Sequence, residues 1–185
     1  MKKVFLLASL VMLLLQSCIP LKFNTGVVNP TPNINLSPST TSLYLSLDST
    51  SIQDTVTSKI QSGALVGTFV IQNWRSSLEN GFQNGFNKYF VLTNSLSSAK
   101  DVLLLSDTKV NVVPVTFDNN SSVTSCKVQI TYKATLLDST GKIMKLDAAT
   151  AESKNVIAGP NQIPGVVQSA IESMYESIAQ KFFNN

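Results

Sequence analysis

Histidine is absent from the whole 185-residue sequence. Its absence removes the Ser-His-Asp and Cys-His forms of nucleophile activation, and with them the commonest metal ligand in proteins. The acidic residues are scattered along the chain, and residues 63–67 lack the Gly-Lys-Ser/Thr ending of a phosphate-binding loop. We therefore expect a protein that is not an enzyme, with no catalytic residues, no metal site and no cofactor. The alternative, an enzyme that uses carboxylates, would be tested by alanine replacement of Asp48 and Asp138.

Cysteine is scarce as well, and one of the two cysteines has an unusual place. The chain begins Met1-Lys2-Lys3, and the stretch from Val4 to Leu15 is almost entirely apolar. A short basic segment followed by about a dozen apolar residues is typical of a secretory signal peptide. A helix of that length, at roughly 1.5 Å per residue, is short for crossing the roughly 30 Å of a bilayer core. Residues 1–17 are therefore predicted to be a signal peptide.

The apolar run ends in Leu15-Gln16-Ser17-Cys18. This tetrapeptide resembles the lipobox of bacterial lipoproteins, in which an apolar residue, a small residue and an obligatory cysteine occupy the first, third and fourth positions. The resemblance implies that Cys18 becomes a diacylglycerol cysteine, that cleavage leaves it at the N-terminus, and that a fatty acid such as palmitate is added there. The alternatives are a cysteine in an ordinary signal peptide and a single-pass anchor. Several acyl chains hold a protein far more firmly than one.

The low charge limits the partners of the mature chain. Charged residues make up 14% of the sequence, and the net charge falls from +3 to +1 when the two lysines of residues 1–17 are removed. This is not the basic footprint of a nucleic-acid-binding protein. It is not a polybasic membrane patch either, so attachment to the membrane is expected to rest on the lipid. With Cys18 acylated, Cys126 has no partner and is expected to be a small, inert strand residue.

The mature chain is predicted to hold one domain behind a spacer. Residues 18–41 are interpreted as the acylated N-terminus and a disordered tether, because prolines alternate there with Asn, Thr and Ser without an apolar period. As a flexible chain, residues 19–41 would span on the order of 25–30 Å. Residues 42–185 are predicted to form a single α+β domain.

Within this domain the apolar periodicity predicts strands and two helices. Leu43 to Asp48 alternates as a half-buried strand, and residues 49–68 are interpreted as a long loop, with a short strand near 63–66. A helix follows, with Ile71, Trp74, Leu78, Phe82, Phe86 and Tyr89 on one stripe, for which core packing is favoured over a binding face. Strands are expected at 101–105 and 110–117, where Pro114 indicates an edge or a bulge. A hairpin over 127–153 and a final helix over 164–182 complete the domain. The predicted fold class is a two-layer α+β sandwich, with an antiparallel or mixed sheet packed against two helices.

The order of these elements resembles a known group of lipoproteins. The helix NWRSSLENGFQNGFNKYF, the strand AKDVLLL and the hairpin VQITYKATLLDSTGKIM, followed by a last helix, are similar to YajG-type lipoproteins and to the auxiliary lipoproteins of ABC-type lipid transporters. More distantly they resemble the amino-terminal domain of TolB and the LptE fold. The arginine that often follows the first strand in YajG-type sequences, as D-x-R, is missing after Asp48.

The first functional hypothesis is a non-enzymatic, membrane-anchored periplasmic lipoprotein, an accessory or binding component of an envelope transport or assembly system. Its partners would be the membrane through Cys18, and an envelope protein or a lipid, with no nucleic acid. Ile19 stands where aspartate retains some lipoproteins in the inner membrane, which favours the outer membrane facing the periplasm; the inner membrane and the cell surface stay open. The alternative is a surface-exposed lipoprotein that binds host or matrix material.

Overall fold

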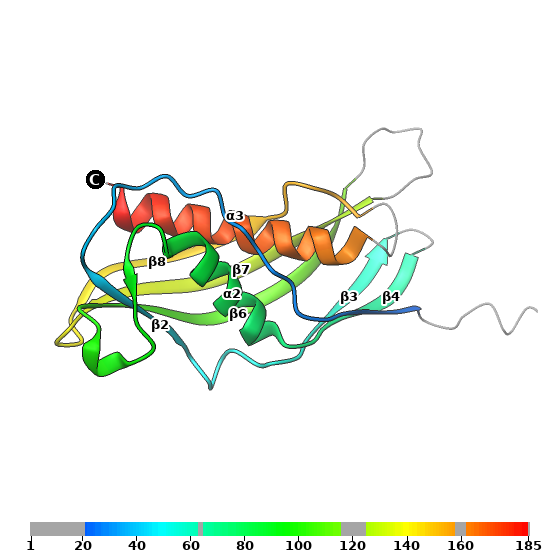
Figure 1. Ribbon diagram of the computed structural model, residues 1–185. Helices are drawn as coiled ribbons and strands as arrows, with labels where there is room; N and C mark the ends of the chain where they lie inside the picture. Colours follow the sequence, from blue (N-terminus) through cyan, green and yellow to red (C-terminus); the bar gives the residue numbers. More distant parts are fainter. Residues whose placement is uncertain (1–20, 63–64, 116–124, 158–161, 185) are drawn as a thin grey trace, which may run out of the picture.

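The computed structural model describes residues 21–62, 65–115, 125–157 and 162–184. Two sheets and two helices form an elongated α+β molecule (Figure 1), which confirms the predicted fold class. The elements are β1 (Leu21–Thr25), β2 (Ser42–Leu47), β3 (Val56–Ser62), β4 (Leu65–Ile71), α2 (Trp74–Phe86), β5 (Val91–Leu92), the 3-10 helix η2 (Leu96–Ser98), β6 (Asp101–Val115), β7 (Ser125–Asp138), β8 (Ile143–Glu152) and α3 (Ile163–Phe183). The predicted signal peptide and Cys18 lie outside the described residues.

The larger sheet has the strand order β5-β2-β6-β7-β8 and is mixed. Strand β2 lies parallel to both β5 and β6, while the pairs β6–β7 and β7–β8 are antiparallel. Along β7 the residues of one face, from Cys126 to Leu136, are buried, whereas the other face is mixed, with Thr131 and Lys133 exposed in its middle. This alternation of period two confirms the predicted hairpin and sets its register.

Strand β6 is continuous where the sequence predicted two strands. It bends at a bulge between Ser106 and Lys109, with Asp107 at a positive φ of 53°. Strand β2 pairs only with residues 101–105 of β6. Pro114 lies in the part of β6 that β2 does not reach, so its missing N–H costs no hydrogen bond to β2.

A second, three-stranded sheet has the order β1-β4-β3. Strands β3 and β4 form a hairpin, and β1 pairs in parallel with β4 from Leu21 opposite Gly67 to Thr25 opposite Ile71. The prediction of a long loop over 49–68 is therefore wrong for residues 56–62 and 65–68, which are strands, while residues 49–55 form a loop as expected. The inner face of this sheet is apolar, and its Phe69 and Ile71 are fully buried.

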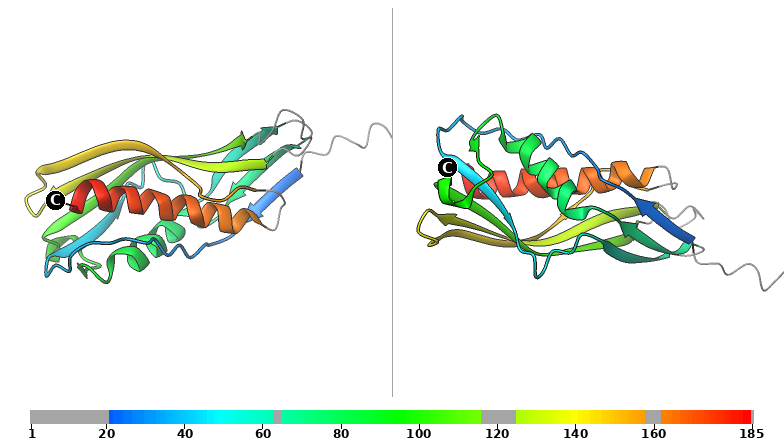
Figure 2. Two further views of the ribbon diagram at one scale, coloured as in Figure 1. Left: turned by 90° about the horizontal axis from the view of Figure 1, so that it is seen from above. Right: turned by 60° about the horizontal axis from the view of Figure 1, so that its bottom comes forward.

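The two helices pack closely over the inner face of the larger sheet. Helix α3 runs lengthwise along β7 and β8, and α2 lies beside it (Figure 2). A Cβ added at Gly81 of α2 would stand 2.9 Å from Ile171 Cγ2 and 2.9 Å from Tyr175 Cε2 of α3. The Tyr175 hydroxyl donates a hydrogen bond to the Leu78 carbonyl at 2.8 Å. Gly81 therefore permits a close approach of α2 to α3.

Residues 26–41, which we call the strap, are ordered, and their first half runs along both helices (Figure 1). Val28, Pro30, Pro32 and Ile34 are buried, and the residues between them are exposed. Pro32 and Ile34 fill the space over Gly85 of α2, where an added Cβ would stand 2.9 Å from Ile34 Cδ1. The prediction of a disordered tether over 18–41 is wrong for residues 21–41, because alternate side chains of the strap enter the core.

Two carboxylates of α3 hold the strap by its main chain. The Thr31 amide donates to Glu172 Oε1 at 2.9 Å, and the Asn33 amide donates to Glu176 Oε1 at 3.0 Å. Glu172 and Glu176 are one helical turn apart, while Thr31 and Asn33 are two residues apart in an extended chain, so the two spacings nearly match. This pair of glutamates therefore binds a neighbouring segment of the chain.

Candidate functional site

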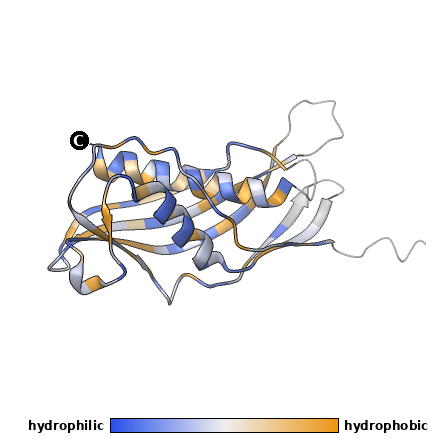
Figure 3. Ribbon diagram, in the orientation of Figure 1, coloured by the Kyte–Doolittle hydropathy of each residue, from blue (hydrophilic) through white to orange (hydrophobic). Residues whose placement is uncertain are grey.

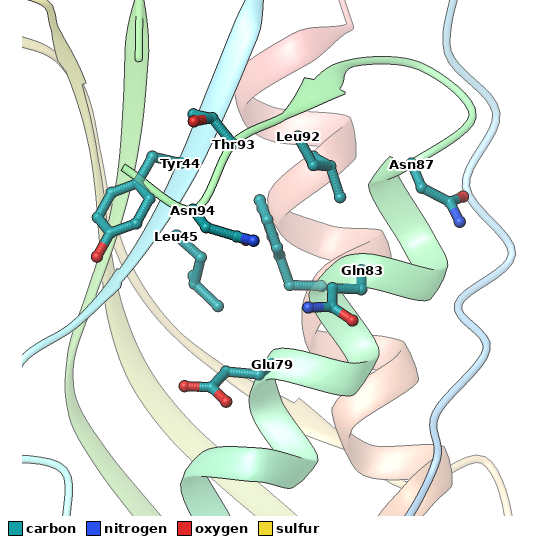
Figure 4. A pocket seen from close by; sticks show the side chains of 9 residues that line it. Tyr44, Leu45, Glu79, Gln83, Asn87, Leu92, Thr93 and Asn94 are labelled. Atoms are coloured by element: carbon teal, nitrogen blue, oxygen red, sulfur yellow. The ribbon is translucent and has the colours of Figure 1, made fainter. Parts of the chain in front are cut away.

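A groove of about 470 Å³ opens between α2 and the β2–β5 edge of the larger sheet (Figure 4). Strand β2 contributes one wall, α2 the other, and the turn after β5 closes one end. The groove is lined by Tyr44, Leu45, Glu79, Phe82, Gln83, Asn87, Leu92, Thr93 and Asn94.

The floor of the groove is apolar and well packed. Phe82 is 4% exposed, and its ring centroid lies 5.2 Å from that of Phe86 and 6.4 Å from that of Tyr175. Trp74 and Phe86 are fully buried. These aromatic residues are core residues, as predicted, so they support the groove from beneath.

The rim of the groove is polar. Glu79, Gln83, Asn87 and Asn94 are exposed, and Figure 4 shows Glu79 and Gln83 on successive turns of α2 and Asn87 just beyond its last residue. Hydrophilic turns of α2 are visible in Figure 3. A carboxylate and three amides offer both hydrogen-bond donors and acceptors. The sequence analysis missed these residues. They come from separate segments, and polar residues on the outer side of a helix give no signal of their own.

An unpaired strand edge faces the groove. Strand β5 pairs only with Ser42 and Leu43, and β2 continues to Leu47. The Leu43 carbonyl accepts a hydrogen bond from the Thr93 amide on this side at 3.1 Å. In a strand, the N–H and C=O groups of every second residue point to the same side. Leu45 therefore presents its N–H and C=O to the side on which Leu43 binds Thr93. The Leu47 carbonyl accepts a bond from Arg75 Nη2 at 3.1 Å. Among the residues that the structure describes, none pairs with the main chain of Leu45 on this side of β2.

Asp48 and Asp138, the two carboxylates considered for catalysis, lie far apart in the sheet and each closes a turn. Asp48 accepts hydrogen bonds from the Thr50 amide and the Ser51 hydroxyl at 2.9 Å and 2.7 Å. The Thr140 and Lys142 amides donate to Asp138 at 2.9 Å and 3.0 Å.

These hydrogen bonds lower the pKa of both carboxyl groups, with the Ser51 hydroxyl as the main cause at Asp48 and the Thr140 hydroxyl at Asp138. A general base near neutral pH needs the opposite shift. The two residues therefore act as turn-closing acceptors.

Cys126 is buried and free, at the start of β7. Burial raises the pKa of its thiol, which keeps the thiol protonated and unreactive. The expectation that Cys126 is a strand residue is confirmed. Over the described ranges, no helix is long and apolar enough to cross a membrane.

The chain has structural relatives although its sequence gives no match. No family model and no curated protein matches it. A crystal structure of a Xanthomonas campestris protein of the DUF330 family superimposes with a TM-score of 0.53 at 12% identity, over 88% of this chain and 94% of that one. A minor lipoprotein from Acinetobacter baumannii gives a TM-score of 0.48 at 13% identity, over 78% and 91%. Lipoprotein B from Nitrosomonas europaea, uncharacterized, gives 0.49 at 6% identity, over 80% and 84%. The Xanthomonas protein shares the fold of this chain.

Proposed function

We propose that this protein is a non-enzymatic bacterial lipoprotein, anchored through Cys18, whose groove between α2 and β2 binds an extended segment of an envelope protein. It would serve as an accessory component of a transport or assembly system. The anchor is supported by Leu15-Gln16-Ser17-Cys18 behind the apolar run, and the observation that carries the binding role is the free main chain of Leu45 in a groove with a polar rim.

An extended peptide fits this groove by its hydrogen-bonding groups. A segment laid beside β2 would pair with the N–H and C=O of Leu45, as an added strand does at a sheet edge. The amides of Gln83, Asn87 and Asn94 lie within the same groove and offer contacts to its polar groups. The apolar floor at Leu45 and Phe82 would take one side chain of the peptide.

A lipid acyl chain fits the groove less well. It would cover the carboxylate of Glu79 and the amides of the rim without offering them hydrogen bonds, and an uncompensated buried polar group costs about 1–3 kcal/mol. A protein segment can satisfy the same groups. The groove therefore favours a protein partner over a lipid.

The test is a pull-down of the tagged, full-length protein from mild detergent, read by mass spectrometry. We expect a stoichiometric envelope protein with the wild type, and its loss when Asn87→Lys and Asn94→Lys are combined, because two long cations then occupy the rim. The matched control is Asn155→Lys, at an exposed loop position away from the groove. A partner that survives the double variant, or a preparation that carries only lipid, would contradict the proposed groove.

The proposed location is the periplasmic face of the outer membrane. Protease added to intact cells should then leave the domain uncut, whereas degradation would favour a surface lipoprotein that binds host or matrix material.

A further inference from the structure

We propose that the outer face of the three-stranded sheet β1-β4-β3 lies against the membrane surface, with Lys22 and Lys59 on anionic phospholipid headgroups. This inference rests on the proposed acylation of Cys18 and adds to it an orientation of the domain and a second contact with the membrane.

The first support is the length of chain between the anchor and the fold. Cys18 precedes Leu21, the first residue of β1, by three residues, and three residues extend at most about 11 Å. Strand β1 is fixed in register against β4 over its whole length. Only this short stretch separates the anchor from β1, so the end of the molecule that carries β1 is held within about one headgroup layer of the lipid.

The second support is the charge on that end. Lys22 of β1 is opposite Thr68 of β4, and Thr68 is opposite Lys59 of β3, so the three residues form one row across the sheet. Both lysines are exposed, and neither has an ion-pair partner among the residues that the structure describes. With strands about 4.8 Å apart, their Cα atoms are about 10 Å apart. The sequences of the three strands contain no acidic residue.

A third lysine extends the same surface. Strand β3 lies against the second half of β6, where the Val112 amide donates to the Ser58 hydroxyl at 3.2 Å. Lys109 of β6 is exposed and lines a shallow hollow together with Thr57 of β3. Each lysine near an anionic surface contributes about 1 kcal/mol. This is too little to bind the protein alone, but enough to orient a domain that the lipid already holds.

The remaining faces of this end are unsuitable for contact with anionic lipid. The inner face of the small sheet is closed, because Phe69 and Ile71 are fully buried in the same core as the helices. The helix layer carries Glu79, Glu172 and Glu176; the last two hold the strap, and Glu176 is also paired with Lys154 at 2.8 Å. An orientation with the lysine row on the lipid leaves the groove beside α2 free to bind its partner.

The experiment uses the acylated, full-length protein in vesicles of phosphatidylethanolamine and phosphatidylglycerol. An environment-sensitive fluorophore is attached through Thr57→Cys, on the outer face of β3, or through Gln180→Cys, at an exposed position of α3. Cys126 is 3% exposed and does not compete for the label. Headgroup-level quenchers should quench the fluorophore at position 57 and leave that at position 180 unquenched.

Two changes should then abolish the difference in quenching between positions 57 and 180, while the protein still sediments with the vesicles. Lys22→Glu combined with Lys59→Glu should remove the quenching at position 57, and so should molar salt, which shortens the screening length to about 3 Å. Equal quenching at positions 57 and 180 in sedimented wild-type protein would overturn the orientation and leave the anchor standing. Failure of the wild type to sediment would overturn the anchor and the orientation with it.

Discussion

Replacing Gly81 by valine should lower the free energy of unfolding by about 1–3 kcal/mol, the usual cost of overpacking a close contact. The new Cβ would lie 2.9 Å from atoms of Ile171 and Tyr175, both fully buried in α3. Tyr175 cannot move aside cheaply, because its hydroxyl is bonded to the Leu78 carbonyl. The helices must separate, and β-branching adds a smaller penalty in a helix. Chemical denaturation followed by tryptophan fluorescence measures the change, since Trp74 is buried at the start of α2.

The matched control is Gly165→Ala in α3. Nothing lies within 4 Å of a Cβ added at Gly165, so the gain in helix propensity, up to about 1 kcal/mol, is unopposed. Equal effects at the two glycines would mean that α2 and α3 do not approach as closely as described.

Replacing Ile34 by alanine should lower the free energy of unfolding by about 2–4 kcal/mol, as at other buried isoleucines. The residue is 7% exposed, although it belongs to a segment whose composition is that of a linker. Its side chain packs over Gly85, and its carbonyl accepts a hydrogen bond from the Tyr89 hydroxyl. Limited proteolysis should also show faster cleavage within the strap.

Val27→Ala is the control, because Val27 lies in the same strap and is 51% exposed. An exposed substitution of this kind should change stability by less than about 0.5 kcal/mol. If the two variants are equally stable and equally resistant to protease, the strap is not part of the core.

The strap shows where composition and periodicity disagree. Its prolines and polar residues are typical of a linker, and on that ground a disordered tether was expected. Val28, Pro30, Pro32 and Ile34 nevertheless alternate with exposed residues, which is the period of a half-buried strand. Proline fills apolar space as well as a small aliphatic residue does, so counting it as apolar would have revealed the pattern.

The parts of the fold that were predicted from sequence have strong periods of their own. The stripe from Trp74 to Phe86 and the alternation along β7 each specify one element and its buried face. The hairpin of β3 and β4 was missed because Gly63 and Gly67 break the apolar run and because β3 is polar on its outer face. Its buried residues become apparent only when the two strands are paired.

The groove could not be predicted, because it belongs to no single segment. Its walls come from β2, α2 and the turn after β5, and its free strand edge depends on β5 ending two residues into its pairing with β2. The hydrogen bonds between β2 and β5 join residues that are far apart in the sequence, so no local pattern predicts them. The lipobox-like tetrapeptide is the opposite case, since the resemblance rests on four consecutive residues, 15–18, at the end of an apolar run.

Mass spectrometry of the N-terminal peptide from detergent-extracted protein tests the central proposal most directly. We predict a chain that begins at Cys18 and carries a diacylglycerol thioether, and we predict that Cys18→Ala keeps residues 1–17 and gains no lipid. An unmodified Cys18, or a mature N-terminus at another residue, would contradict the anchor on which the proposed function and the orientation on the membrane both depend.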